Sequence, residues 1–104
     1  MRYHFRAGRG KNIIVDGATT FAELGFAILK EYQIIPDHLF MFQFSNGDTT
    51  DSACPLGPID DGFGNVSIEM KIKDRKMDIG ETMTFVYDYS RDWSRKVKLI
   101  EKLR

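Results

Sequence analysis

This chain of 104 residues is poor in the residues that cross-link or anchor small proteins, and its formal net charge is zero. It has one cysteine, Cys54, and one tryptophan, Trp93. A single cysteine excludes an internal disulfide and a zinc site built from several cysteines. The longest apolar runs are far shorter than the roughly 20 residues that a membrane-spanning helix needs. We therefore expect a cytoplasmic protein that makes no contact with a membrane.

The chain nevertheless contains enough apolar material for a core. Hydrophobic residues make up 42% of the sequence and charged residues 29%, which are proportions typical of a globular domain. No repeat, low-complexity tract or linker divides the sequence. We therefore predict one domain over residues 1–104.

The zero net charge hides an uneven distribution of charges. The N-terminal segment holds Arg2, Arg6, Arg9 and Lys11 without an acid among them, whereas residues 45–70 contain acids but no lysine or arginine. Basic residues also outnumber acidic ones at the C-terminal end. Such a chain can carry one basic and one acidic face, although ordinary solvated edges are the simpler interpretation.

Periodicity predicts the secondary structure. Six segments read as strands: 2–7, 12–15, 38–44, 66–72, 83–90 and 96–103. Apolar and polar residues alternate in 2–7, 66–72, 83–90 and 96–103, as in half-buried strands, whereas 12–15 is a short β-branched run. Thr20 and Glu23 form a capping box that starts a helix, and Gly25 in that helix indicates close packing against a strand. Residues 45–65 read as a long loop, and residues 73–80 as a connector with Met77 and Ile79 turned inward.

This order of elements predicts an α+β domain, in which one main helix packs on one face of a mixed or mostly antiparallel sheet. The opening hairpin and helix also suggest an analogy with ubiquitin-like, or β-grasp, folds. Residues 38–44 are apolar on both sides, so they read as a central strand covered on two sides. The expected core consists of Phe5, Phe21, Leu24, Ile28, Phe40, Phe42, Ile68, Met70, Phe85, Tyr87, Val97 and Leu99.

Three motifs, in this order, resemble the plasmid pRiA4b ORF-3-like family of bacteria, archaea and mobile elements. Residues 15–24 are similar to that family's valine, turn and Thr-Thr-Phe-x-Glu-Leu helix start. Residues 37–42 are similar to its Asp-His-Leu-aromatic-x-Phe strand, and residues 85–89 with Trp93 to its Phe-x-Tyr-x-Tyr-Asp-Phe-Gly-Asp-x-Trp signature. The resemblance implies an α+β fold of this size and no established activity.

The chain departs from the family at its last motif. Ser90 and Arg91 stand where the family usually has Gly-Asp, and Ser94 and Arg95 stand where it usually has Glu-His. A function that needs the acidic, histidine-bearing turn therefore does not carry over to this sequence.

Asp88 and Trp93 are the most prominent candidate site residues. A carboxylate at a strand end can accept N–H groups of the following turn, and a tryptophan can cover the edge of a core. We expect chiefly structural roles for both. Together with Arg91 they also form the candidate partner patch.

The sequence indicates neither catalysis nor a cofactor. His38 leads an aromatic strand and reads as a structural histidine, and Cys54 has no basic activator nearby in sequence. The loop carboxylates lack the spacing of an EF-hand and read as solvated: Asp48, Asp51, Asp60 and Asp61. No catalytic residue, cofactor or metal ligand is therefore predicted.

Two binding functions remain. The favoured hypothesis is a non-enzymatic interaction or regulatory module with a protein partner. The alternative is a nucleic-acid-binding accessory protein with a basic face, formed only if the first and last strands are neighbours. The residues of that candidate basic face are Arg2, Arg6, Lys96, Lys98 and Lys102. Neither the partner's identity nor the oligomeric state follows from the sequence.

Overall fold

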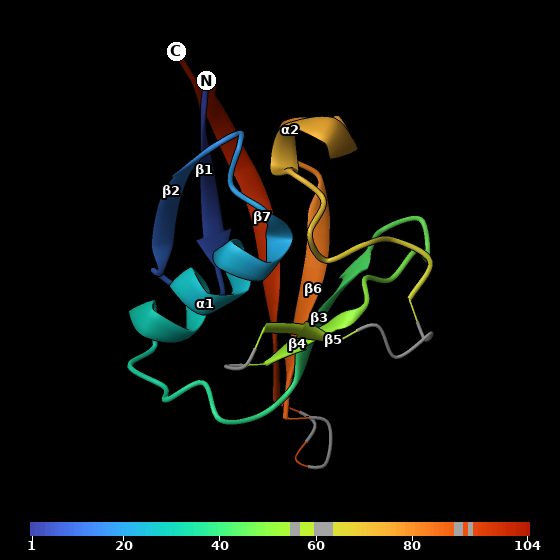
Figure 1. Cartoon of the computed structure of the whole chain (residues 1–104). Helices are drawn as coiled ribbons and strands as arrows, with labels where there is room; N and C mark the ends of the chain where they lie inside the picture. The colour runs from blue at the N-terminus through green and yellow to red at the C-terminus, as the bar shows by residue number, and fades with distance from the viewer. Residues whose placement is uncertain (55–56, 60–63, 89–90, 92) are drawn as a thin grey trace.

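The structure, a computed structural model, describes residues 1–54, 57–59, 64–88, 91 and 93–104. These residues form seven strands and two helices (Figure 1). In chain order the elements are β1 (Arg2–Ala7), β2 (Asn12–Asp16), α1 (Phe21–Glu31), β3 (Phe40–Phe44), β4 (Ser52–Cys54), β5 (Gly57–Ile59), α2 (Ile72–Arg75), β6 (Thr82–Tyr87) and β7 (Trp93–Leu103). The predicted α+β class is confirmed.

The strands form one sheet in the order β2-β1-β7-β6-β3-β4-β5. Each pair of neighbouring named strands is antiparallel. β7 is the last strand in the sequence, yet it lies between β1 and β6 and joins the first hairpin to the rest of the sheet. The predicted mostly antiparallel sheet is therefore present, with α1 as the longer of the two helices.

α1 begins as its sequence predicts. The Thr20 side chain accepts a hydrogen bond from the Glu23 backbone N–H at 3.2 Å, and the Glu23 carboxylate accepts one from the Thr20 N–H at 3.0 Å. Phe21, Leu24 and Ile28 are fully buried. A Cβ atom on Gly25 would overlap the Phe40 ring, so the close approach of helix and strand requires glycine here.

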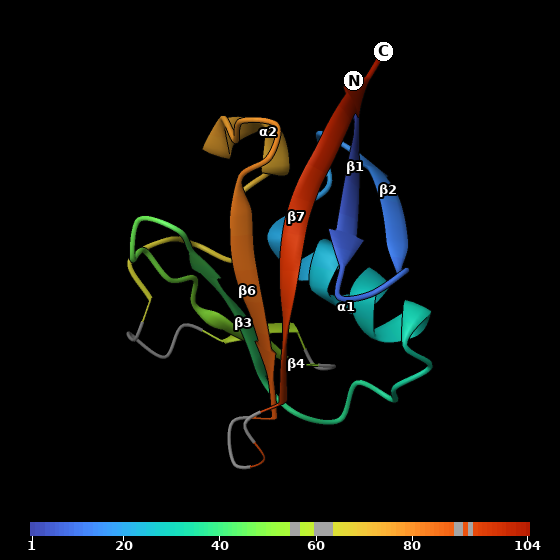
Figure 2. The same cartoon turned by 180° about the vertical axis from the view of Figure 1, so that it is seen from behind.

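The core is one cluster between α1 and the sheet. All the residues predicted for it are buried except Met70, which is partly buried against the cluster. α1 covers one face of the sheet, and the view from behind shows the strands in front of it (Figure 2). On β3, Phe40, Phe42 and Phe44 are buried while Gln43 is exposed. The prediction that this strand is covered on both sides is therefore wrong, because no helix of the described chain packs on the Gln43 side.

The predicted strand at residues 66–72 is also wrong. Val66 makes only an isolated bridge with Thr50, and α2 begins at Ile72. The intervening carbonyls instead accept hydrogen bonds at the start of α1: Ile68 O from the Ala22 N–H and Met70 O from the Phe21 N–H. Free N–H groups of a helix start need such acceptors, so this segment caps α1 rather than pairing in the sheet.

Two smaller predictions also need correction. The long loop at residues 45–65 contains two three-residue strands, β4 and β5, which are too short for their periodicity to be recognised. In the connector, Met77 is buried as predicted, but Ile79 is 61% exposed. Neither helix in the described part of the chain is long and apolar enough to cross a membrane.

Candidate functional site

The predicted partner patch lies at a hollow of about 470 Å³ beside the end of β6. Asp88, Arg91 and Trp93 all line it. The other lining residues come from β6 and from the segment that links α1 to β3: Gln33, Ile34, Ile35, Asp37, His38 and Tyr87. The structure thus brings together two segments that are about fifty positions apart in the sequence.

The linking segment is held by the way α1 ends. Gln33 takes a left-handed conformation with φ of 57°. Its N–H donates to Lys30 O at 3.0 Å, and the Ile34 N–H donates to Leu29 O at 2.9 Å. This is the hydrogen-bond pattern of a Schellman motif. It turns the chain away from the helix axis and across the end of the sheet.

Tyr87 also holds the segment that links α1 to β3. Its hydroxyl donates to Ile35 O at 2.8 Å, lies 2.9 Å from Asp37 Oδ1 and accepts a hydrogen bond from the Asp37 N–H at 3.2 Å. Burial raises the pKa of the Tyr87 hydroxyl, and the hydrogen bond to the Asp37 side chain adds to the increase. The phenol therefore stays neutral and continues to hold residues 35–37 in place.

Charged side chains meet inside the hollow. Asp88 Oδ2 lies 3.4 Å from Arg91 Nε and 3.7 Å from His38 Nε2, and its side chain is only 8% exposed. His38 Nε2 is also 3.4 Å from Asp37 Oδ1, which places the imidazole between two carboxylates. The Arg91 side chain is 83% exposed. One carboxylate is therefore buried and paired, while Asp37 stays accessible.

Asp88 itself sits in a strained backbone conformation, with φ of 54°. Its N–H donates to Leu39 O at 3.0 Å, and its backbone carbonyl accepts the Arg91 N–H at 2.9 Å. The prediction that the Asp88 carboxylate accepts turn N–H groups concerns residues 89, 90 and 92, which lie outside the described residues. For Arg91, the acceptor is the carbonyl of Asp88 rather than its carboxylate.

Trp93 covers the edge of the core, as expected from its sequence context. Its ring makes edge contacts with Tyr32, Tyr87 and Phe85 at centroid distances of 5.4, 6.0 and 6.3 Å. The Arg95 guanidinium lies over the ring at 4.1 Å. Trp93 is therefore both a packing residue and one wall of the hollow.

The first and last strands, which carry the residues of the candidate basic face, are neighbours as that hypothesis requires. Arg2 is exposed on β1, where it pairs with Asp16 of β2. Arg6 pairs with Lys98, and both side chains point away from the buried residues Phe5, Val97 and Leu99. Lys96 is exposed on the same side as Lys98, two residues before it on β7.

Lys102 does not belong to that face. The pairing of β1 with β7 shifts between His4 and Phe5, because His4 pairs with Glu101 whereas Phe5 pairs with Leu99. The extra residue in β7 reverses the alternation beyond it. Lys102 therefore pairs with Tyr3 on the core side, and its ammonium lies 5.8 Å from the Tyr3 ring centre.

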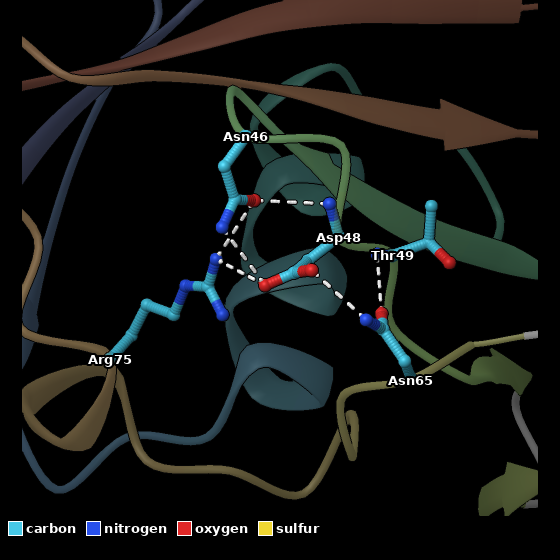
Figure 3. Close-up of polar contacts among 5 residues, drawn as sticks. All are labelled: Asn46, Asp48, Thr49, Asn65 and Arg75. Carbon is cyan, nitrogen blue, oxygen red and sulfur yellow. Dashed lines mark hydrogen bonds and ion pairs between the residues drawn. The ribbon is translucent and has the colours of Figure 1, made fainter.

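One loop carboxylate is not merely solvated, contrary to the sequence-based prediction. Asp48 accepts hydrogen bonds from Arg75 at 3.0 Å, Asn65 at 2.9 Å and Asn46 at 3.0 Å (Figure 3). These bonds, led by those from Asn65 and Asn46, hold the pKa of the Asp48 carboxyl below its usual range. The cluster ties the turn after β3 to α2.

The remaining loop residues give no further site. Asp60 and Asp61 lie outside the described residues, and Cys54 belongs to β4. Among the residues that are described, no group of three or more His, Cys, Asp or Glu side chains is placed to hold a metal ion.

Comparisons of this chain with protein-family models, curated proteins and solved structures found no match. The resemblance to the pRiA4b ORF-3-like family therefore stays a prediction.

Sequence reasoning did not select Asp37 or Tyr87 as site residues. Tyr87 was assigned to the core, and it is indeed buried, but its hydroxyl reaches the hollow. The signal that could have identified Asp37 is its position directly before His38 and the aromatic strand, because strand ends often carry binding groups.

Proposed function

We propose that this chain is a non-enzymatic interaction module, and that the hollow at the end of β6 binds a basic side chain of a partner protein. The observation that carries this proposal is the pre-formed hollow itself. Its aromatic walls are fixed by packing, and Asp37 is fixed by Tyr87 before any partner arrives. Pre-organised groups lower the entropy cost of binding.

The charges of the hollow favour a cation. The described lining contains two carboxylates, those of Asp37 and Asp88, and one guanidinium, that of Arg91, so it carries a net negative charge when His38 is neutral. The Asp37 side chain is 66% exposed and can accept a charge-assisted hydrogen bond from a lysine or arginine. The rings of Tyr87 and Trp93 beside it can add cation–π attraction.

The described lining favours binding over catalysis. It contains no serine, threonine or cysteine side chain that His38 could activate as a nucleophile. The imidazole between two carboxylates is suited to orienting them toward a bound cation.

The proposal also includes four expectations that the sequence raised. They are membership of the pRiA4b ORF-3-like family, the mobile-element association that it implies, a β-grasp-like architecture and a cytoplasmic location. The support for them is the α+β sequence of elements, which is of the kind that the family resemblance implies.

Affinity purification from the native host tests the partner site. Tagged wild type, Asp37→Lys and Asp74→Lys are compared, and retained proteins are identified by mass spectrometry. Asp74 is exposed on α2, so its variant makes the same charge change away from the hollow. We expect one partner to be retained by wild type and Asp74→Lys and lost by Asp37→Lys.

Direct titration then measures the effect on affinity. Trp93 is the only tryptophan and lines the hollow, so its fluorescence should change when the purified partner binds. Asp37→Lys should weaken binding at least tenfold. Equal affinity of the three proteins would contradict the proposal.

A further inference from the structure

The face of the sheet opposite α1 is open to solvent. In Figure 2 the strands of this face lie in front of the helix. The side chains on it alternate with the buried core residues along β1, β7 and β6. This outer face contains side chains that neither the core nor the hollow uses.

Strand register aligns hydrogen-bond donors on the outer face in two rows. The first row crosses four strands and consists of Asn12, Arg6, Lys98 and Thr82. The second row crosses three strands and consists of Lys96, Thr84 and Gln43. All of these side chains are exposed or half-exposed, and each carries at least one donor. No carboxylate stands in either row.

The three cations of these rows are free to meet a ligand. Within the described part of the chain, Arg6, Lys96 and Lys98 have no carboxylate within 4.0 Å. The acid that follows on the same face, Glu101, is bonded to His4 at 3.1 Å. Neighbours within a row are about 5 Å apart and the rows are about 7 Å apart, given ordinary sheet spacings. A polyanion can therefore contact several of these donors at once.

Where the structure describes it, the outer face presents no phenylalanine, tyrosine or tryptophan ring from β1, β3, β6 or β7 on which a single strand could stack. The aromatic residues of β1, β3, β6 and β7 contact the core side, where Tyr3, Phe5, Phe42, Phe85 and Tyr87 are buried. Base stacking on aromatic rings supplies much of the affinity for unpaired nucleotides. Donors without aromatics suit phosphate groups instead, which position a protein on a duplex without reading its sequence.

We propose that the outer face binds the phosphate backbone of double-stranded nucleic acid through Arg6, Lys96 and Lys98. Lys102, which the sequence had grouped with them, takes no part because it lies on the other face. The proposal shares no residue with the hollow, so either one can fail alone.

Fluorescence anisotropy of a labelled 20-base-pair DNA duplex tests this proposal. Three phosphate contacts predict that log K falls with log salt with a slope of about −2.7, and that affinity is micromolar or weaker at low salt. Lys96→Glu should reduce affinity at least tenfold at about 50 mM salt and reduce the slope by about 1. Lys98→Glu should do the same, which guards against a folding defect in one variant.

Lys102→Glu is the matched control, because it makes the same charge change on the same strand. We expect it to change affinity less than threefold, with all variants showing the circular dichroism of wild type. Equal losses in Lys96→Glu and Lys102→Glu would overturn the proposal, as would no binding at 25 mM salt. Tighter binding to a single strand, or equal binding to polyglutamate, would also overturn it, the latter in favour of an acidic protein partner.

Discussion

Single residues decide how closely the layers of this domain approach. Gly25 is the point at which α1 meets β3, because the space of a Cβ atom is taken by the Phe40 ring. Asp88 is the point at which β6 ends, because its φ of 54° leaves the strand conformation. The role of each residue can therefore be tested by a single substitution.

Replacing Gly25 with alanine should destabilise the protein although alanine is the better helix former. Alanine gains about 1 kcal/mol in helix propensity, whereas overpacking a core costs about 1–3 kcal/mol. We expect a lower midpoint of urea unfolding. Lys30→Ala, on the exposed side of the same helix, should leave the midpoint nearly unchanged. A higher midpoint for Gly25→Ala would show that Phe40 can move aside.

Replacing Asp88 with asparagine should lower the free energy of unfolding by about 1–3 kcal/mol, the cost of leaving buried polar groups without their partners. Asparagine tolerates the same left-handed conformation, so the variant tests the charge beside His38 and Arg91. Urea unfolding of Asp88→Asn is compared with that of Asp74→Asn on exposed α2. Unchanged stability together with lost partner binding would assign Asp88 to recognition instead.

At the scale of elements, the sequence predicts those helices and strands whose positions depend on local residue patterns. The capping box predicts the start of α1, alternation predicts β1 and the β6–β7 hairpin, and short apolar runs predict β2 and β3. Alternation also predicts a strand at residues 66–72, which is wrong. A segment can bury every second residue without pairing in a sheet. Lys102 was assigned to the wrong face of the sheet. The extra residue in β7 that reverses its orientation can be recognised only from the pairing of β7 with β1.

The candidate site was partly predictable for the same reason. Asp88, Arg91 and Trp93 are close in sequence, so a local pattern found them together. Asp37 and His38 join them only because the Schellman turn directs the segment after α1 across the end of β6. Such a meeting of distant segments is a property of the tertiary fold.

His4 connects three strands, and it should make their association depend on pH. Its Nε2 lies 2.9 Å from Asn12 Oδ1 on β2, and its Nδ1 lies 3.1 Å from Glu101 Oε1 on β7. The hydrogen bond with Asn12, followed by that with Glu101, raises the pKa of His4, against smaller opposing effects of burial and of the Arg6 charge. The folded state therefore favours protonated His4.

The sign of the effect follows from linkage. Because the folded pKa exceeds the unfolded value of about 6.5, the stabilisation is complete below that value and is lost as pH rises through the folded pKa. We expect the urea midpoint of wild type to fall over this window and that of His4→Gln to fall less. Glu101→Gln should give an intermediate result. Parallel curves for wild type and His4→Gln would contradict this role.

At the scale of the whole molecule, one core supports both halves of the sheet. Phe85 lies near its centre, with ring centres 5.3 Å from Phe40 and 5.2 Å from Phe42. Phe85→Ala should cost about 3–5 kcal/mol, a large part of the 5–15 kcal/mol typical of a domain. Trp93 fluorescence and far-ultraviolet circular dichroism should report the same lowered midpoint. An unchanged midpoint would contradict a single shared core.

The position of β7 has a consequence for how the protein is made. During translation β1 and β2 emerge from the ribosome first. The strand that pairs with β1 on its other side, β7, is synthesised after all the other strands. The two halves of the sheet cannot pair until β7 has been synthesised. Until then, the free edge of β1 and the aromatic core residues are exposed to solvent. Pairings of such large sequence separation also form slowly. Nascent chains stalled before β7 should therefore be sensitive to proteases and prone to aggregation.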